Sequence, residues 1–141
     1  MKFWDSSAIV PLILAEEESP WARKLLRSDP RALVWCLSPV EVRSALARRV
    51  REERLGANAY TAARNRADRL FHDLSQVLAW ELVRKRAMRL LDSHPLRAAD
   101  SLQLAAALIA ARDRPHDLPF VTLDGRLAEA AHKEGLPVES A

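Results

Sequence analysis

Residues Leu33–Glu41 read Leu-Val-Trp-Cys-Leu-Ser-Pro-Val-Glu, an apolar run followed at once by a helix start. The unbroken apolar run Leu33–Leu37 is typical of a β-strand that is buried on both faces. Ser38 suits the N-cap of a helix, Pro39 the first helical position and Glu41 the third. A buried strand that leads directly into a helix is the building unit of an α/β protein with a parallel sheet.

The same strand-then-helix unit occurs twice more along the chain. The short apolar start Met1–Trp4 is followed by the cap-forming Asp5-Ser6-Ser7, and Phe120–Leu123 is followed by Asp124-Gly125. Weaker strands are predicted at Val77–Trp80 and Leu136–Val138, and helices at Ala8–Glu16, Ser19–Ser28, Ser38–Leu55, Ala57–Leu74, Leu82–Asp92, Leu96–Arg112 and Gly125–Lys133. The Leu96–Arg112 segment is apolar nearly all round, as expected of a central helix. We therefore predict an α/β/α sandwich with a central, mostly parallel sheet and right-handed crossovers.

The composition of the chain bounds the class of protein. Of its 141 residues, 49% are hydrophobic, 29% are charged and 6% are aromatic, which excludes a disordered tail or a collagen-like fibre. The length predicts a single domain over residues 1–141. Cys36 is the one cysteine, so nothing favours an oxidising compartment. The longest apolar run, Ala8–Ala15, falls well short of the ~20 residues of a spanning helix, and we expect a cytoplasmic protein.

The net charge of +3 conceals an uneven distribution. Between Arg43 and Arg97 there are 13 basic and 6 acidic residues, whereas the remaining segments hold 9 basic and 13 acidic residues. A basic middle with acidic ends is consistent with a cationic surface for a polyanion beside a carboxylate site. Solvated arginine-rich helix faces would give the same count.

Four acidic residues occupy positions from which they could share one site. Asp5 and Asp124 each follow a predicted strand, and Glu41 lies in the first turn of the helix after a third strand. Because the carboxyl ends of parallel strands share one sheet edge, these three should meet there. Asp100 joins them if the central helix begins at that edge.

Each acid also has a purely structural interpretation. Asp5 and Asp124 could be N-caps, Glu41 could complete a capping box with Ser38, and Asp100 could favour the helix dipole by ~0.3–1 kcal/mol. Four carboxylates brought together are costly unless a cation neutralises them. Mg²⁺ or Mn²⁺ would do so with oxygen ligands.

Other kinds of site find little support in the sequence. The four histidines lack the close pairing of a zinc site, Cys36 falls in a predicted core strand, and three glycines provide no phosphate-binding loop. Phosphatases of the haloacid-dehalogenase type need a second aspartate two residues after the first, and Ser7 occupies that position here.

Four blocks, in family order, resemble the PIN-domain ribonucleases, and in particular the VapC-type toxins of toxin–antitoxin pairs. These blocks are Phe3–Ala8, Ser38–Leu46, Leu96–Ala105 and Phe120–Leu127, which together span nearly the whole chain. The resemblance implies a PIN-like sandwich and a Mg²⁺- or Mn²⁺-dependent endoribonuclease. It also implies that Asp5, Glu41, Asp100 and Asp124 form the family's acidic quartet, with Ser7 and Thr122 in supporting positions.

The chemistry of RNA hydrolysis suggests a role for each member of the quartet. Asp5 and Asp100 would be the main metal ligands, Asp124 would hold a second metal or its water, and Glu41 would orient water or act as base. Arg43, Arg48 and Arg97 in the basic segment would contact RNA phosphates.

The resemblance further implies a VapB-like antitoxin as partner, and family members commonly form homodimers. The apolar helix faces between Glu41 and Leu74 are the candidate interface for such a dimer. Two other functions remain open from sequence: a housekeeping RNA-processing nuclease with the same site, and a non-catalytic RNA- or protein-binding module with vestigial acids.

Overall fold

The computed structural model describes residues 1–112 and 114–141. Its centre is a parallel sheet of five strands in the order β3-β2-β1-β4-β5. The strands span Lys2–Trp4 (β1), Ala32–Trp35 (β2), Ser75–Val77 (β3), Phe120–Val121 (β4) and Val138–Glu139 (β5). Phe3 of β1 is in register with Leu33 on one side and Phe120 on the other. The predicted parallel α/β/α architecture is confirmed.

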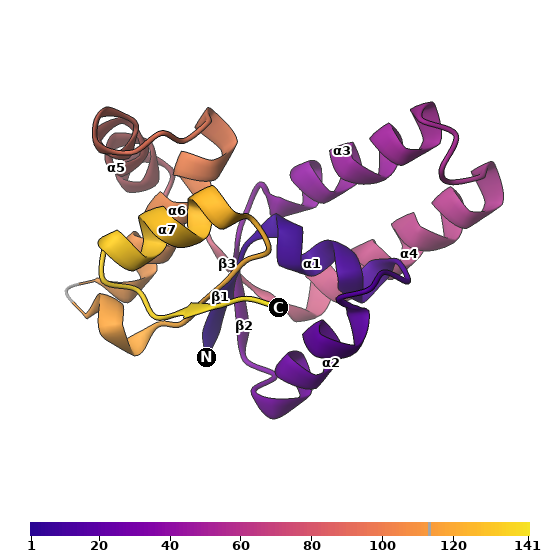
Figure 1. The fold of residues 1–141 in the computed structure, drawn as a ribbon, viewed down its shortest axis with the longest axis horizontal. Coiled ribbons are helices and arrows are strands. Elements are labelled where there is room, and N and C mark those ends of the chain that lie inside the picture. Colours follow the sequence, from indigo (N-terminus) through magenta and orange to yellow (C-terminus); the bar gives the residue numbers. More distant parts are fainter. Residues whose placement is uncertain (113) are drawn as a thin grey trace.

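Helices cover both faces of this sheet (Figure 1). On one side lie α1, α2, α3 and α4, and on the other α5, α6 and α7. The helices span Ser6–Ile13 (α1), Ser19–Ser28 (α2), Ser38–Arg51 (α3), Ala57–Asp73 (α4), Trp80–Ser93 (α5), Ala98–Ala111 (α6) and Gly125–Lys133 (α7), and a 3₁₀ turn (η1) covers Pro115–Asp117.

Alternating side chains of the central strands enter two separate cores. Phe3 and Phe120 stack at 5.5 Å in the core beneath α5, α6 and α7. Their neighbours Trp4 and Val121 point into the core beneath the first four helices. This period of two is what a strand buried on both faces requires, and it explains why the strand segments are apolar throughout.

The apolar faces of α3 and α4 lie inside the second core and are not free for another molecule. Val42, Leu46, Ala63 and Phe71 are all buried there. These four side chains are therefore not available to a dimer interface, whereas Val40 of α3 is 64% exposed, and the expected homodimer stays a prediction.

The boundaries of several elements differ from the predicted ones for local reasons. Helix α1 ends at Ile13 instead of Glu16, because the Glu16 amide donates to Ser19 Oγ at 2.8 Å and starts the turn into α2. Helix α3 ends at Arg51, and Glu53 then adopts a left-handed φ of 57°. Of the helices in the described ranges, none is both long and apolar enough to cross a membrane.

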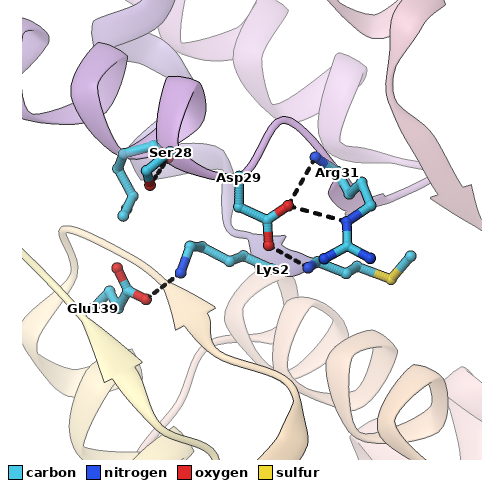
Figure 2. A network of polar contacts seen from close by, with 7 residues as sticks. Lys2, Ser28, Asp29, Arg31 and Glu139 are labelled. Atoms are coloured by element: carbon cyan, nitrogen blue, oxygen red, sulfur yellow. Dashed lines mark hydrogen bonds and ion pairs between the residues drawn. The ribbon is translucent and has the colours of Figure 1, made fainter.

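Ion pairs link the start of β1 to neighbouring segments of the chain (Figure 2). Asp29 lies between the α-amino group of Met1 and Arg31, whose Nε donates to Asp29 Oδ1 at 3.2 Å. Lys2 Nζ reaches past β4 and donates to Glu139 Oε1 at 2.6 Å. These contacts fasten the amino-terminal residues of the chain to the sheet.

Candidate active site

The four acids predicted to share a site line one open pocket of about 410 Å³ at the carboxyl edge of the sheet. Asp5 directly follows β1 and caps α1, while Asp124 caps α7 through a 2.8 Å bond from the Leu127 amide. Glu41 lies in the first turn of α3, and Asp100 lies in the first turn of α6. The pocket therefore collects one carboxylate from each of four helix starts.

Asp5 is held more firmly than a simple N-cap requires. Its side chain is buried, and Oδ2 accepts hydrogen bonds from Ser7 Oγ at 2.5 Å, Thr122 Oγ1 at 2.9 Å and the Ser7 amide at 3.2 Å. Ser7 Oγ in turn accepts from the Leu123 amide at 2.9 Å, and Thr122 Oγ1 from the Asp124 amide at 3.1 Å. The two hydroxyls thus couple Asp5 to the loop that carries Asp124.

Glu41 does not form the capping box that its spacing from Ser38 suggested. Helix α3 is capped at Leu37 without a side-chain hydrogen bond, so Ser38 is already inside the helix. Glu41 Oε2 instead accepts hydrogen bonds from Ser6 Oγ and, at 2.5 Å, from Gln103 Nε2. Its carboxylate is therefore turned toward α1 and α6, that is, into the pocket.

Gln103 is a site residue that the sequence interpretation did not single out. Its side chain is buried, and Nε2 lies 2.7 Å from Ser6 Oγ and 3.0 Å from Ser38 Oγ as well as bonding Glu41. It stands three residues after Asp100, on the same side of α6. A lone amide on the buried face of an apolar helix was the available signal, because such a group needs polar partners.

The carboxylates of the pocket repel one another and are partly removed from water. Burial raises the pKa of Asp5 and of Glu41, and burial together with the nearby Asp124 raises the pKa of Asp100. Within residues 1–112 and 114–141, no salt bridge joins any of the four acids to a basic side chain. The folded protein therefore carries an unfavourable concentration of negative charge that a bound cation would relieve.

This arrangement predicts an unusual pH dependence of stability. The pKa of Asp100 is higher in the folded protein than in the unfolded chain, where it lies near 4. Between these two pKa values the folded state binds more protons than the unfolded state, so the stability of the metal-free protein falls as the pH rises through this range. We expect Asp100→Asn to raise the metal-free melting temperature at pH 7 but not at pH 4, as followed by circular dichroism. A lower melting temperature of Asp100→Asn at pH 7 would contradict this electrostatic account.

Arginines border the acids on one side. Arg48 lines the acid pocket, and together with Arg97 and Arg126 it lines an adjoining hollow of about 830 Å³ that also contains Asp100 and Asp124. Arg43 points elsewhere, since its Nη2 lies 3.3 Å from Asp68 Oδ1 of α4. Of the three arginines expected from the sequence to contact RNA, Arg48 and Arg97 thus lie beside the acids and Arg43 does not. Arg126, which the sequence interpretation did not name, lies beside the acids as well.

The donor set fits a hard divalent cation. Apart from Arg48, the polar side chains that line the pocket carry carboxylate or hydroxyl oxygens, which Mg²⁺ and Mn²⁺ prefer. In the described part of the chain, no three His, Cys, Asp or Glu side chains are close enough to form a ready-made metal cage. The pocket therefore suits an ion that keeps several waters and takes one or two carboxylates directly, as Mg²⁺ usually does.

Comparison with known proteins places this architecture in a family. The model of the PIN domain matches residues 2–133. The chain belongs to the PIN domain family. No curated protein matches this PIN domain in sequence.

Solved structures share the fold at low sequence identity. FitAcB from Neisseria gonorrhoeae is 16% identical with a TM-score of 0.66, over 98% of this chain and 96% of that one. A toxin–antitoxin complex from Klebsiella pneumoniae is 16% identical with a TM-score of 0.65, over 99% and 96%. PAE2754 from Pyrobaculum aerophilum is 18% identical with a TM-score of 0.64, over 97% and 87%. At these identities the likeness concerns the PIN fold alone.

Proposed function

We propose that this PIN domain is an endoribonuclease dependent on Mg²⁺ or Mn²⁺, acting as the toxin of a VapBC-type toxin–antitoxin pair in the cytoplasm. PIN domains are generally nucleases. The observation that carries the proposal is the convergence of Asp5, Glu41, Asp100 and Asp124 on one open pocket. Within the described ranges, none of these carboxylates forms a salt bridge with a basic side chain, which favours a bound metal cation. A metal cation would in turn attract an anionic substrate.

Each side chain of the pocket has a role that its contacts support. Asp5 and Asp100 would hold the ion, with Asp124 completing the site, and Ser7 and Thr122 would keep Asp5 oriented through their hydrogen bonds to Oδ2. When bound, the ion would lower the pKa of a water and stabilise charge on the phosphate oxygens. Glu41, held by Ser6 and Gln103, would orient the attacking water and take its proton.

The arginines beside the acids would position the RNA backbone. Arg48, Arg97 and Arg126 line the hollow next to Asp100 and Asp124, where a phosphodiester would enter. Arginine suits this task because its guanidinium can make paired hydrogen bonds to a phosphate. Arg43 would serve only if its ion pair with Asp68 opened on binding.

Salt dependence tests these contacts. We expect Arg48→Ala and Arg97→Ala each to weaken single-stranded RNA binding and to reduce the slope of log K against log salt by about 0.7 per lost phosphate contact. Arg27→Ala, which replaces an exposed arginine of α2, is the matched control and should leave the slope unchanged. Fluorescence anisotropy over a salt series measures both quantities. Equal slopes in the wild type and all three variants would remove the arginines from the RNA path.

The likeness to a toxin–antitoxin complex supports the toxin assignment. The Klebsiella structure is a toxin–antitoxin complex, and the proposed partner here is a VapB-like antitoxin that occupies the acid pocket. Expression of the wild type should slow bacterial growth, and co-expression of a small protein encoded beside it should restore growth. Growth that stays normal at high expression, with nuclease activity present in vitro, would favour a housekeeping nuclease. A homodimer remains part of the proposal, to be measured by sedimentation.

Metal binding tests the proposed cofactor without any assumption about the RNA target. Calorimetric titration with Mn²⁺ should give a binding isotherm for the wild type that is lost or greatly weakened in Asp5→Asn and Asp100→Asn. At ~100 times its dissociation constant, the ion should stabilise the fold by about 2.7 kcal/mol. If Mn²⁺ binds equally well to both variants, or not at all to the wild type, the metal site is rejected.

A further inference from the structure

A second pocket lies at the carboxyl edge of the sheet, outside the acid site. It has a volume of about 290 Å³ and is lined by Trp35, Leu37, Trp80, Glu81, Arg84 and Leu102. Trp35 ends β2, and Trp80 begins α5, so both indoles stand where these elements meet the carboxyl edge. Their rings meet edge to face at 5.2 Å. The result is an aromatic hollow beside a nuclease site.

Two elements connect this hollow to the acid pocket. Helix α6 contributes Asp100 to the acid pocket and Leu102 to the hollow, two residues on, which places them on nearly opposite sides of the helix. Helix α3 contributes Glu41 to the acids, while Leu37 at its N-cap lines the hollow. A helix with its side chains is about 10–12 Å across, so a strand of RNA at the acids needs to travel only a short way to reach the hollow.

The chemistry of the hollow fits a planar, partly apolar group attached to an anionic backbone. Trp80 is 53% exposed although it is a large aromatic residue, while the neighbouring Trp35 is buried and provides a fixed floor. Arg84 can donate to a phosphate or stack on a ring, and Glu81 can accept from the amino group of a base. An aromatic platform with an arginine at its edge is how proteins bind unpaired nucleobases.

A second copy of the chain is the competing occupant, since α5 and the turn before it also expose Leu78, Leu82, Met88 and Leu91. The charges on α5 argue against it. The helix carries four cations against two acids: Arg84, Lys85, Arg86 and Arg89 against Glu81 and Asp92. A symmetric contact would bring the cations of two copies together, whereas the phosphates of RNA would neutralise them.

We propose that the hollow formed by Trp80, Trp35 and Arg84 is a nucleobase subsite, which holds one unpaired base of the RNA about the width of a helix away from the scissile phosphate. The base stacks on Trp80, and Leu37 and Leu102 form the apolar walls of the hollow. Arg84 contacts the phosphate of the nucleotide whose base is bound. The inference rests on the proposed nuclease function, and it adds a second position, outside the metal site, at which the protein binds the RNA.

Binding of RNA to an inactive protein tests the subsite separately from catalysis. In an Asp100→Asn background with Mg²⁺, anisotropy of a labelled single-stranded RNA should show a roughly 5- to 150-fold loss of affinity for Trp80→Ala. Trp80→Phe keeps a ring and should retain most of the affinity. Leu82→Ala is the control, because Leu82 is 58% exposed, close to the 53% of Trp80, but lies outside the hollow. Melting curves confirm that each variant is folded.

Abasic scanning of the RNA identifies the base that enters the hollow. With Trp80 present, loss of one particular base should weaken binding, and with Trp80→Ala the same loss should have no further effect. Equal affinity of Trp80→Ala and the parent, or an unchanged abasic pattern, overturns the subsite. So does a change of mass on sedimentation with Trp80→Ala but not Leu82→Ala, which would place Trp80 in a dimer interface.

The outcome also separates this inference from the function on which it rests. If the wild type cleaves RNA and Trp80→Ala binds it as tightly as the parent, the subsite is wrong and the nuclease stands. If the wild type neither binds nor cleaves RNA, the proposed function fails first and the subsite with it.

Discussion

Asp100→Asn will lower RNA cleavage by about 10²–10³-fold or more, because a divalent ion at this site supplies several kcal/mol of transition-state charge stabilisation. Asn keeps the shape of the side chain and removes the negative charge that would hold the ion. Helix α6 also starts from backbone contacts, including a bond from the Ser101 amide to the Arg97 carbonyl, and the Asn oxygen can still accept from the Arg97 backbone as the carboxylate does, so the helix start should be preserved. Single-turnover cleavage of an end-labelled RNA in Mg²⁺ measures the loss.

The control for Asp100→Asn is Glu17→Gln, which removes an exposed acid between α1 and α2. It should cleave RNA at the wild-type rate. Together with the higher metal-free stability expected of Asp100→Asn, this would show that the loss of activity does not come from unfolding. Full activity in Asp100→Asn would remove this residue from the catalytic machinery.

Glu41→Gln will reduce kcat by about 10²–10⁴-fold, the usual contribution of a positioned general base. The oxygen of the new side-chain amide can still accept hydrogen bonds from Ser6 and Gln103, so the structure of the first turn of α3 should be preserved. KM should change little, because the group acts on the water and not on the RNA. A raised KM with unchanged kcat would assign Glu41 to substrate binding instead.

Replacement of Gln103 should reduce kcat less than replacement of Glu41 does, because Gln103 acts only by orienting Glu41. Gln103→Met keeps the length of the side chain but removes the amide that donates to Glu41, and it should lower kcat by about 10–100-fold because Glu41 loses a group that orients it. Ser38→Ala is the matched control, since Ser38 Oγ accepts from the same amide and makes no hydrogen bond to Glu41 among the described residues. If Gln103→Met and Ser38→Ala behave alike, Gln103 has a structural role only.

The sequence sufficed to place three of the four acids because topology alone determines their positions. Asp5, Glu41 and Asp124 each follow a parallel strand, and such strands bring their carboxyl ends to one edge whatever their neighbours are. Asp100 follows no strand, so its place depended on where α6 begins, which is a matter of tertiary packing. The sequence also did not predict that Glu41 bonds Ser6 and Gln103 instead of forming a capping box with Ser38, because Ser6 and Gln103 are far from Glu41 along the chain.

Surface properties were the hardest to predict from the sequence. Apolar periodicity identifies the faces of α3 and α4 but not what covers them, and here α1 and the sheet do so. Trp35 and Trp80 could be assigned to strands or their ends, but only the fold brings their rings together. Charge counts likewise indicated a basic middle without separating Arg48 and Arg97 at the acids from Arg43, which pairs with Asp68.

The central claim is that the four carboxylates form one metal-dependent site for RNA hydrolysis. The most direct measurement is cleavage of a broad RNA panel by the purified protein after removal of metal with a chelator and again after addition of Mn²⁺ or Mg²⁺. The claim predicts no cleavage without metal, specific cleavage after addition, and none at any metal concentration for Asp5→Asn. Cleavage that persists in the chelator or in Asp5→Asn, or no cleavage by the wild type with either ion, would contradict it.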